Sequence, residues 1–205
     1  MRSTALSRLV LIAALIAPLV AIAQSFAPST RIRGTIDKVD GRSVVIKSRN
    51  GSSNTVQLKE GAPVVAVVPG SMADIKGNTF VGITATAQPD GTIKAVEVHV
   101  FPEQMRGTGE GHYAWDLMPN STMTNAAVSQ QVKNVEGNAL TLKYKDGEKT
   151  IVVPSEATIV NLMPGEAGDL KVGAKAFVPR WEKAADGTWQ AAVIVVGRNG
   201  LTPPM

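Results

Sequence analysis

Cysteine is absent from this 205-residue sequence, and aromatic residues are few: three Trp, two Tyr and four Phe. Without cysteine, a disulfide-stabilised scaffold and any thiolate metal site are excluded. Charge is moderate and mixed, with 21 Lys and Arg against 17 Asp and Glu. This balance, together with 44% hydrophobic residues, is typical of a folded globular protein and excludes a disordered or collagen-like chain.

Long hydrophobic runs are also scarce, and the one present lies near the N-terminus. Arg2 and Arg8 precede an uncharged apolar run at residues 9–22, which leads to Ala23. This pattern predicts a signal peptide at residues 1–23, and therefore a periplasmic or secreted protein. A membrane anchor is the competing interpretation, but 14 helical residues span only about 21 Å of a hydrocarbon core roughly 30 Å thick.

Two of the 21 basic residues belong to this leader, so its removal would leave an excess of only two positive charges. A basic balance this small gives no electrostatic argument for nucleic acid, which we do not expect as a partner. No second long apolar stretch follows the leader, so we do not expect the mature chain to be embedded in a membrane.

The rest of the sequence contains the same pattern twice. The matching segments lie 95 or 96 residues apart. They are IDKVDG (36–41) with VKNVEG (132–137), VVIK (44–47) with LTLK (140–143), DIK (74–76) with DLK (169–171), and DGT (90–92) with DGT (186–188). A period this long predicts a duplicated small domain rather than a solenoid. We expect repeats at residues 31–101 and 129–198, a connector at 102–128 and a tail at 199–205.

Each repeat has the pattern of β-structure. Apolar and polar residues alternate in several short runs, as in Val96, Val98 and Val100. The Asp-Gly pairs predict tight hairpin turns, and Ser71 is a candidate N-cap for one helical turn. Five or six short strands per repeat favour a small closed barrel, so the sequence predicts an all-β protein of two tandem barrels.

These motifs resemble an exported bacterial family of small OB-like barrels of unknown function. The resemblance rests on the glycine-bounded opening at 34–41, the Asp-Ile/Leu-Lys turns beginning at Asp74 and Asp169, and the Asp-Gly-Thr hairpins. It covers nearly all of residues 31–198, although Gln130 replaces the first opening glycine in the second repeat. The resemblance implies two OB-like barrels and an extracytoplasmic location, but no activity. Some relatives carry a metal-transporter label, and this chain lacks the spanning helices of a permease.

The connector between the repeats is rich in glycine, methionine and aromatic residues, so we expect it to be ordered and packed. Thioether and imidazole ligands favour copper, especially Cu(I), and the connector offers Met105, His112, Met118 and Met123. Glycines at 107–111 could turn around a phosphate, but no lysine accompanies them.

Two other interpretations of the connector remain open. Tyr113 and Trp115 could recognise a ligand or partner at a barrel mouth, and Arg180 with Trp181 forms a candidate binding patch in the second repeat. Alternatively, Trp115 and the methionines fill the groove between two barrels. The second interpretation predicts that Trp115 is buried.

The last strand of each repeat differs in its outward side chains. Glu97 and His99 alternate with apolar residues in the first repeat, and we expect them on a half-solvated face. The matching positions of the second repeat are Val193 and Val195, so that strand is apolar on both faces. We therefore expect the connector or the other barrel to cover Val193 and Val195.

Two functional hypotheses follow. The first is a non-enzymatic extracytoplasmic binding or interaction module whose partner is a periplasmic protein or a small ligand. The second is a periplasmic metal-handling protein that uses the His/Met connector. We expect no enzyme, because the common nucleophile and zinc-hydrolase signatures are absent from the sequence. No cofactor is expected under the first hypothesis, and copper is the metal expected under the second.

Overall fold

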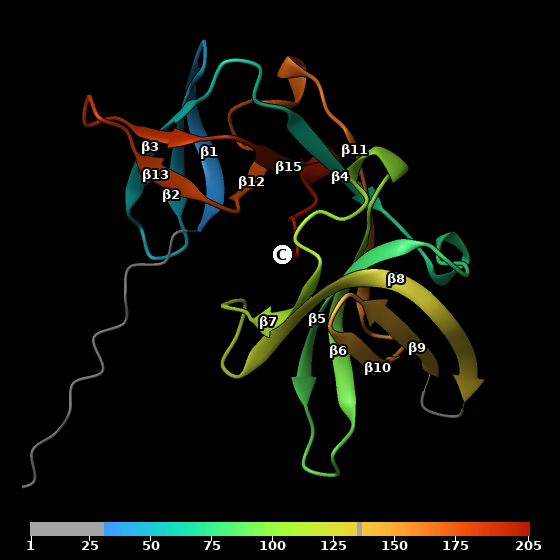
Figure 1. Ribbon diagram of the computed structural model, residues 1–205. Helices are drawn as coiled ribbons and strands as arrows, with labels where there is room; N and C mark the ends of the chain where they lie inside the picture. Colours follow the sequence, from blue (N-terminus) through green and yellow to red (C-terminus); the bar gives the residue numbers. More distant parts are fainter. Residues whose placement is uncertain (1–30, 135–136) are drawn as a thin grey trace, which may run out of the picture.

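The computed structural model describes residues 31–134 and 137–205, so the predicted signal peptide lies outside the described residues. Within them the chain is all-β, as the sequence predicts, with short 3-10 turns between strands. The strands form one continuous sheet that folds into two groups, seen as two lobes in Figure 1.

The first group is a closed five-strand barrel, called the barrel below. Its strands pair in the order β8-β9-β10-β6-β5 and back to β8, and only β10 and β6 are parallel. The strands are β5 (Phe80–Ala87), β6 (Ile93–Val100), β8 (Ser121–Asn134), β9 (Gly137–Tyr144) and β10 (Gly147–Val153). Strand β7 (Gly111–Ala114) is an additional strand on β8.

The second group, called the second unit, repeats this order of pairing. Strand β12 pairs with β1, β1 with β2, β2 with β3, and β3 runs parallel to β14, while β15 returns to β12. Its strands are β1 (Ile32–Asp40), β2 (Ser43–Ser48), β3 (Ser53–Leu58), β12 (Lys175–Val178), β13 (Trp181–Lys183), β14 (Trp189–Ala191) and β15 (Ile194–Gly197).

The predicted arrangement of one barrel per repeat is not confirmed, because each group takes strands from both repeats. The barrel combines the later strands of residues 31–101 with the earlier strands of residues 129–198, and the second unit combines the remainder. Strand β8 also runs through the expected boundary after residue 128. The strand pairing therefore exchanges halves between the two predicted repeats.

Two strands carry the chain across between the groups. Strands β4 (Val64–Pro69) and β11 (Thr158–Pro164) lie antiparallel, with Val65 opposite Pro164 and Pro69 opposite Val160. Strand β4 also pairs with β15, and β11 pairs with β6. The sequence of β4, VVAVVP, has no polar side chain, as suits a strand covered on both faces.

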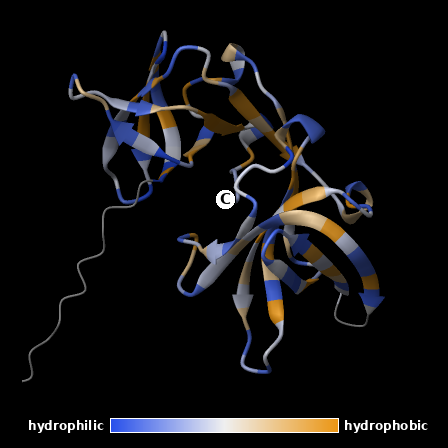
Figure 2. Ribbon diagram, viewed as in Figure 1, coloured by the Kyte–Doolittle hydropathy of each residue, from blue (hydrophilic) through white to orange (hydrophobic). Residues whose placement is uncertain are grey.

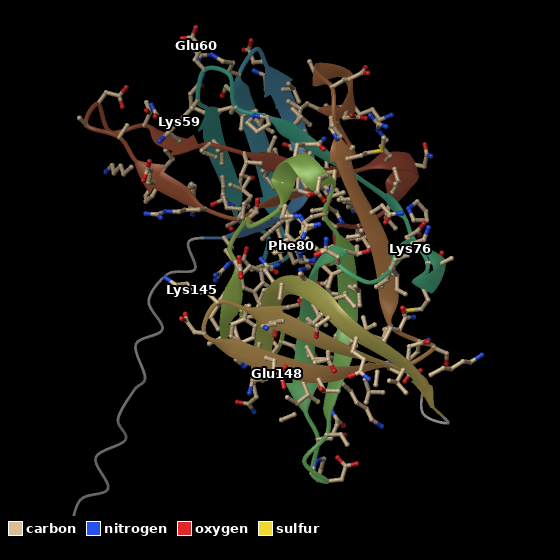
Figure 3. The ribbon with its side chains drawn as sticks, turned by 45° about the vertical axis from the view of Figure 1, so that its right-hand side comes forward. Lys59, Glu60, Lys76, Phe80, Lys145 and Glu148 are labelled. Atoms are coloured by element: carbon tan, nitrogen blue, oxygen red, sulfur yellow. The ribbon has the colours of Figure 1, made fainter. Side chains whose placement is uncertain are left out.

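Three apolar clusters follow from this arrangement, and Figure 2 shows hydrophobic segments on the inner sides of both lobes. One fills the barrel and one fills the second unit. The third, called the central cluster, joins them. Its buried members are Val65, Val67, Phe80, Phe101, Val160, Leu162, Phe177, Val195 and Met205. Phe80 accordingly lies in the middle of the molecule in Figure 3.

The predicted Asp-Gly-Thr hairpins are present, and their hydrogen bonds match. Asp90 accepts hydrogen bonds from the backbone N–H and the hydroxyl of Thr92, at 2.9 and 2.7 Å. Asp186 accepts the same two bonds from Thr188 at the same distances. Gly91, between the first pair, has a φ of 84°, which a side chain would strain. The short turns η1 (Met72–Asp74), η3 (Ala167–Asp169), η2 (Glu103–Met105) and η4 (Arg198–Gly200) complete the chain.

Candidate functional site

A pocket of about 580 Å³ lies beside the central cluster, where residues from the barrel, the connector and the second unit meet. This volume is in the range of small-molecule sites. Its apolar lining consists of Val65, Phe101, Met105, Met123, Leu162, Phe177, Val193, Val195 and Met205. Its polar lining includes His99, Tyr113, Trp115, Asn125, Arg31 and Arg180.

The strand register explains how the barrel presents polar groups to this pocket. Because side chains alternate between faces, residues two apart on each strand share the outer face of the barrel wall. Two rows cross β7, β8, β5 and β6 in that order: Gly111, Asn125, Gly82 and His99, then Tyr113, Met123, Thr84 and Glu97.

Glu97 and His99 form a buried polar pair on this face. Their side chains are 1% and 3% exposed, so the expected half-solvated position is wrong. His99 Nδ1 lies 3.2 Å from Glu97 Oε2, and the Thr84 hydroxyl donates to Glu97 Oε1 at 2.6 Å. The pair is covered because β11 runs alongside β6 and Phe101 packs edge-on against the imidazole, with centroids 4.8 Å apart. His99 is thereby fixed with its other edge toward Gly82.

The absence of a side chain at Gly82 makes room for His99. A Cβ at this position would lie 2.0 Å from His99 Nε2 and 2.5 Å from Asn125 Oδ1. Asn125 is itself held by two bonds, because its Nδ2 donates to the Thr108 carbonyl at 3.1 Å and to the Tyr113 hydroxyl oxygen at 3.3 Å. Its Oδ1 is buried and has no hydrogen-bond partner within residues 31–134 and 137–205.

Trp115 provides a second buried polar atom without a partner. Its indole Nε1 is buried and donates no hydrogen bond to any residue that the structure describes, whereas the ring is half-buried against the central cluster. The guanidinium of Arg31 lies 4.0 Å above the ring centroid, and Phe177 packs edge-on at 6.4 Å. Trp115 therefore packs against the cluster that joins the two groups of strands, but it is half-buried rather than buried as predicted.

Two arginines, Arg31 and Arg180, line the pocket together with His99, and no Asp or Glu does so among the described residues. His99 is paired with Glu97, 3.2 Å away. The positive charge of Arg31 is partly offset by the Asp116 carboxylate, 3.6 Å away. Burial raises the pKa of Tyr113 above its usual value, so this phenol stays protonated and can donate.

Five predicted site residues meet at this pocket. Met105, Tyr113, Trp115, Met123 and Arg180 all line it. Val195 is covered by the central cluster, against which Val193 and Trp115 also pack, so the expected intramolecular cover is confirmed.

The other three predicted site residues lie elsewhere. His112 is next to Tyr113 on β7 and points to the opposite face, where its Nδ1 lies 2.8 Å from the Thr124 hydroxyl. Met118 is 41% exposed in the turn after Trp115. Trp181 stacks on Trp189 with centroids 4.3 Å apart. The four predicted copper ligands are thus not gathered at this pocket, and no group of three or more His, Asp or Glu in the described ranges could hold a metal ion.

A second hollow, of about 400 Å³, lies on the second unit and is called the basic groove. Its cations are Arg33, Lys47, Arg49 and Lys175, and Leu117 and Pro203 supply apolar lining. Two of the four cations are engaged: Arg33 with Asp116 at 2.7 Å, and Lys175 with the Thr35 hydroxyl at 2.8 Å. Because it carries positive charge outside the pocket, the basic groove provides a control for non-specific attraction of anions.

Sequence reasoning missed His99 and Asn125 as pocket residues. The glycine at position 82, inside an otherwise apolar and β-branched strand, was the available signal, because such a glycine marks a close approach of other atoms.

Comparison with protein-family models, with curated proteins and with solved structures finds no match for this chain. In the part of the chain that the structure describes, no helix has the length and apolar character needed to cross a membrane.

Proposed function

We propose that this protein is a non-enzymatic binding protein that holds a small, largely apolar ligand in the pocket beside the central cluster. One observation carries the proposal: the 580 Å³ pocket is lined mainly by apolar side chains, and two lining residues, Trp115 and Asn125, have buried polar atoms without partners. Buried polar atoms are nearly always satisfied, so unused capacity at one pocket favours a ligand that supplies the partners. Export, as the leader predicts, would place this binding outside the cytoplasm.

The soft-metal alternative has weaker support. Met105 and Met123 line the pocket, but His112 and Met118 lie outside it, so the predicted ligand set would have to rearrange to hold one ion. An organic ligand requires no such rearrangement.

The neutral fluorescent probe N-phenyl-1-naphthylamine tests the proposal. We expect saturable binding of one probe per chain with enhanced fluorescence. Val193→Trp should weaken it by about tenfold or more, because Val193 lines the pocket and the larger ring fills it. Val172→Trp is the matched control, because Val172 is exposed and does not line the pocket. Absence of saturable binding, or equal binding by both variants, would contradict the proposal.

A further inference from the structure

We infer that the pocket selects an apolar anion, a molecule with a carboxylate or similar head group and a hydrocarbon or aromatic body. This inference rests on the proposed function and adds the charge of the ligand to it. Two arginines line the pocket and no carboxylate does among the described residues, whereas the lining histidine His99 is already paired with Glu97. A lining that is apolar with only positive charge is complementary to an apolar anion.

Arg180 is the cation available to the head group. It lines the pocket, its side chain is exposed, and none of the ion pairs among residues 31–134 and 137–205 includes it. The neighbouring carboxylate Glu182 is already bound to Lys59 Nζ at 2.6 Å. The charge of Arg180 is therefore not neutralised by a direct partner, and a guanidinium binds a carboxylate in a planar, two-bond geometry.

Neutral donors on the connector side complement this cation. Trp115 Nε1 can only donate, and it has no acceptor among the described residues. The Tyr113 hydroxyl accepts a bond from Asn125 and retains its own proton for donation. Trp115 Nε1, the Tyr113 hydroxyl proton and the Arg180 guanidinium are thus donors in this lining, and the buried Asn125 Oδ1 is an acceptor. This excess of donors favours an anionic head group over an alcohol or an amine.

The apolar body of the ligand is assigned to the lining residues of the central cluster. Val65, Leu162 and Val195 line the pocket and belong to the central cluster, which joins the barrel and the second unit. Methionines 105 and 123 add unbranched, adaptable side chains that fit bodies of different shape. The polar and apolar walls together define an amphipathic ligand.

Three ten-carbon probes with different head groups test the inference: decanoate, decanol and decylammonium. Each is titrated by calorimetry and by displacement of N-phenyl-1-naphthylamine at neutral pH. We expect decanoate to bind about tenfold more tightly than decanol, and decylammonium most weakly. Arg180→Gln and Trp115→Phe should each weaken decanoate by about three- to tenfold and weaken decanol by a smaller factor.

Two matched variants control for other effects. Arg49→Gln removes one cation from the basic groove, and Trp189→Phe makes the same indole-to-phenyl change outside the pocket. The inference would be overturned if decanoate and decanol bound with equal affinity, or if Arg49→Gln and Arg180→Gln lowered the affinity for decanoate equally. Binding of the naphthylamine would still uphold the proposed function in either case. Failure of the naphthylamine and all three ten-carbon probes to bind would overturn both.

Discussion

Replacing Gly82 with alanine tests the packing on which the pocket depends. The added Cβ would lie 2.0 Å from His99 Nε2 and 2.5 Å from Asn125 Oδ1, and contacts this short do not occur between real atoms. The backbone cannot yield easily, because Gly82 is paired on both sides, to His99 on β6 and to Asn125 on β8. Both side chains must therefore move.

The cost of this movement has two parts. Overpacking a core position costs about 1–3 kcal/mol. Displacing the imidazole also weakens its contact with Glu97, and leaving a buried polar group without its partner costs about 1–3 kcal/mol. We expect the free energy of unfolding to fall by about 3 kcal/mol, which corresponds to a melting temperature lower by roughly 6–12 °C in a chain of this size.

Thermal and urea unfolding monitored by circular dichroism would measure this loss. Gly77→Ala is the matched control, since a methyl group at that position would meet no heavy atom within 4 Å and the φ of Gly77 is outside the left-handed region. In a double-variant cycle, Gly82→Ala should cost less stability in the His99→Ala background than in the parent, because the ring that obstructs the new methyl is gone. If Gly82→Ala were as stable as Gly77→Ala, the placement of His99 over Gly82 would be refuted.

Two further predictions concern carboxylate side chains. Glu97→Gln should lower the free energy of unfolding by about 1–3 kcal/mol, because an amide offers only one acceptor oxygen to the buried His99 Nδ1 and Thr84 hydroxyl, and Glu148→Gln, on a surface position, should change it little; equal melting of the two variants would contradict this. The Arg198 guanidinium holds the pKa of Asp169 below its usual 3.8, so this carboxylate stabilises the fold above that pH and loses its effect as the pH falls through the lowered pKa. Asp169→Asn should therefore lower the free energy of unfolding by about 1 kcal/mol at pH 7. Urea unfolding at pH 7 and pH 2 should show that this difference between variant and parent becomes smaller in acid. A difference independent of pH would refute the pairing of Asp169 with Arg198.

Local features of this fold were predictable because their causes are local. The Asp-Gly-Thr turns need only an aspartate that bonds to the threonine two residues on and a glycine that tolerates positive φ. The strand patterns likewise follow from alternation along a few residues, as in Val44 and Ile46, both fully buried in the second unit.

The exchange of strands between the repeats was not predictable in this way. Two segments with similar sequence offer similar partners, so the pattern of β1 alone cannot decide between β5 of its own repeat and β12 of the other. The decision depends on where β4 leads the chain, and β4 pairs with β11 and β15 rather than closing the first repeat. The same long-range arrangement buries Glu97 and His99, which is why their local pattern gave the wrong exposure.

An engineered disulfide can test the exchange directly, because the natural chain contains no cysteine that could compete. Thr35 on β1 lies opposite Lys175 on β12, and the Lys175 ammonium donates to the Thr35 hydroxyl at 2.8 Å. Cross-strand partners in an antiparallel pair have Cα atoms about 4.5–5.5 Å apart, which a disulfide can bridge. We expect Thr35→Cys/Lys175→Cys to form an intramolecular disulfide on oxidation.

The bond should also stabilise the fold, because it closes a loop of 140 residues in the unfolded chain. Chain entropy sets the gain at up to about 5 kcal/mol, measured as the difference in melting temperature between oxidised and reduced protein. The control is Thr35→Cys/Phe80→Cys, because Phe80 pairs with Ala127 in the barrel as Lys175 pairs with Thr35 in the second unit, so these cysteines would meet if β1 paired with β5 of its own repeat. Because β1 and β5 lie in different lobes (Figure 1), the control should retain two free thiols. A disulfide in the control and none in the first variant would show that each repeat closes on itself and would refute the exchange.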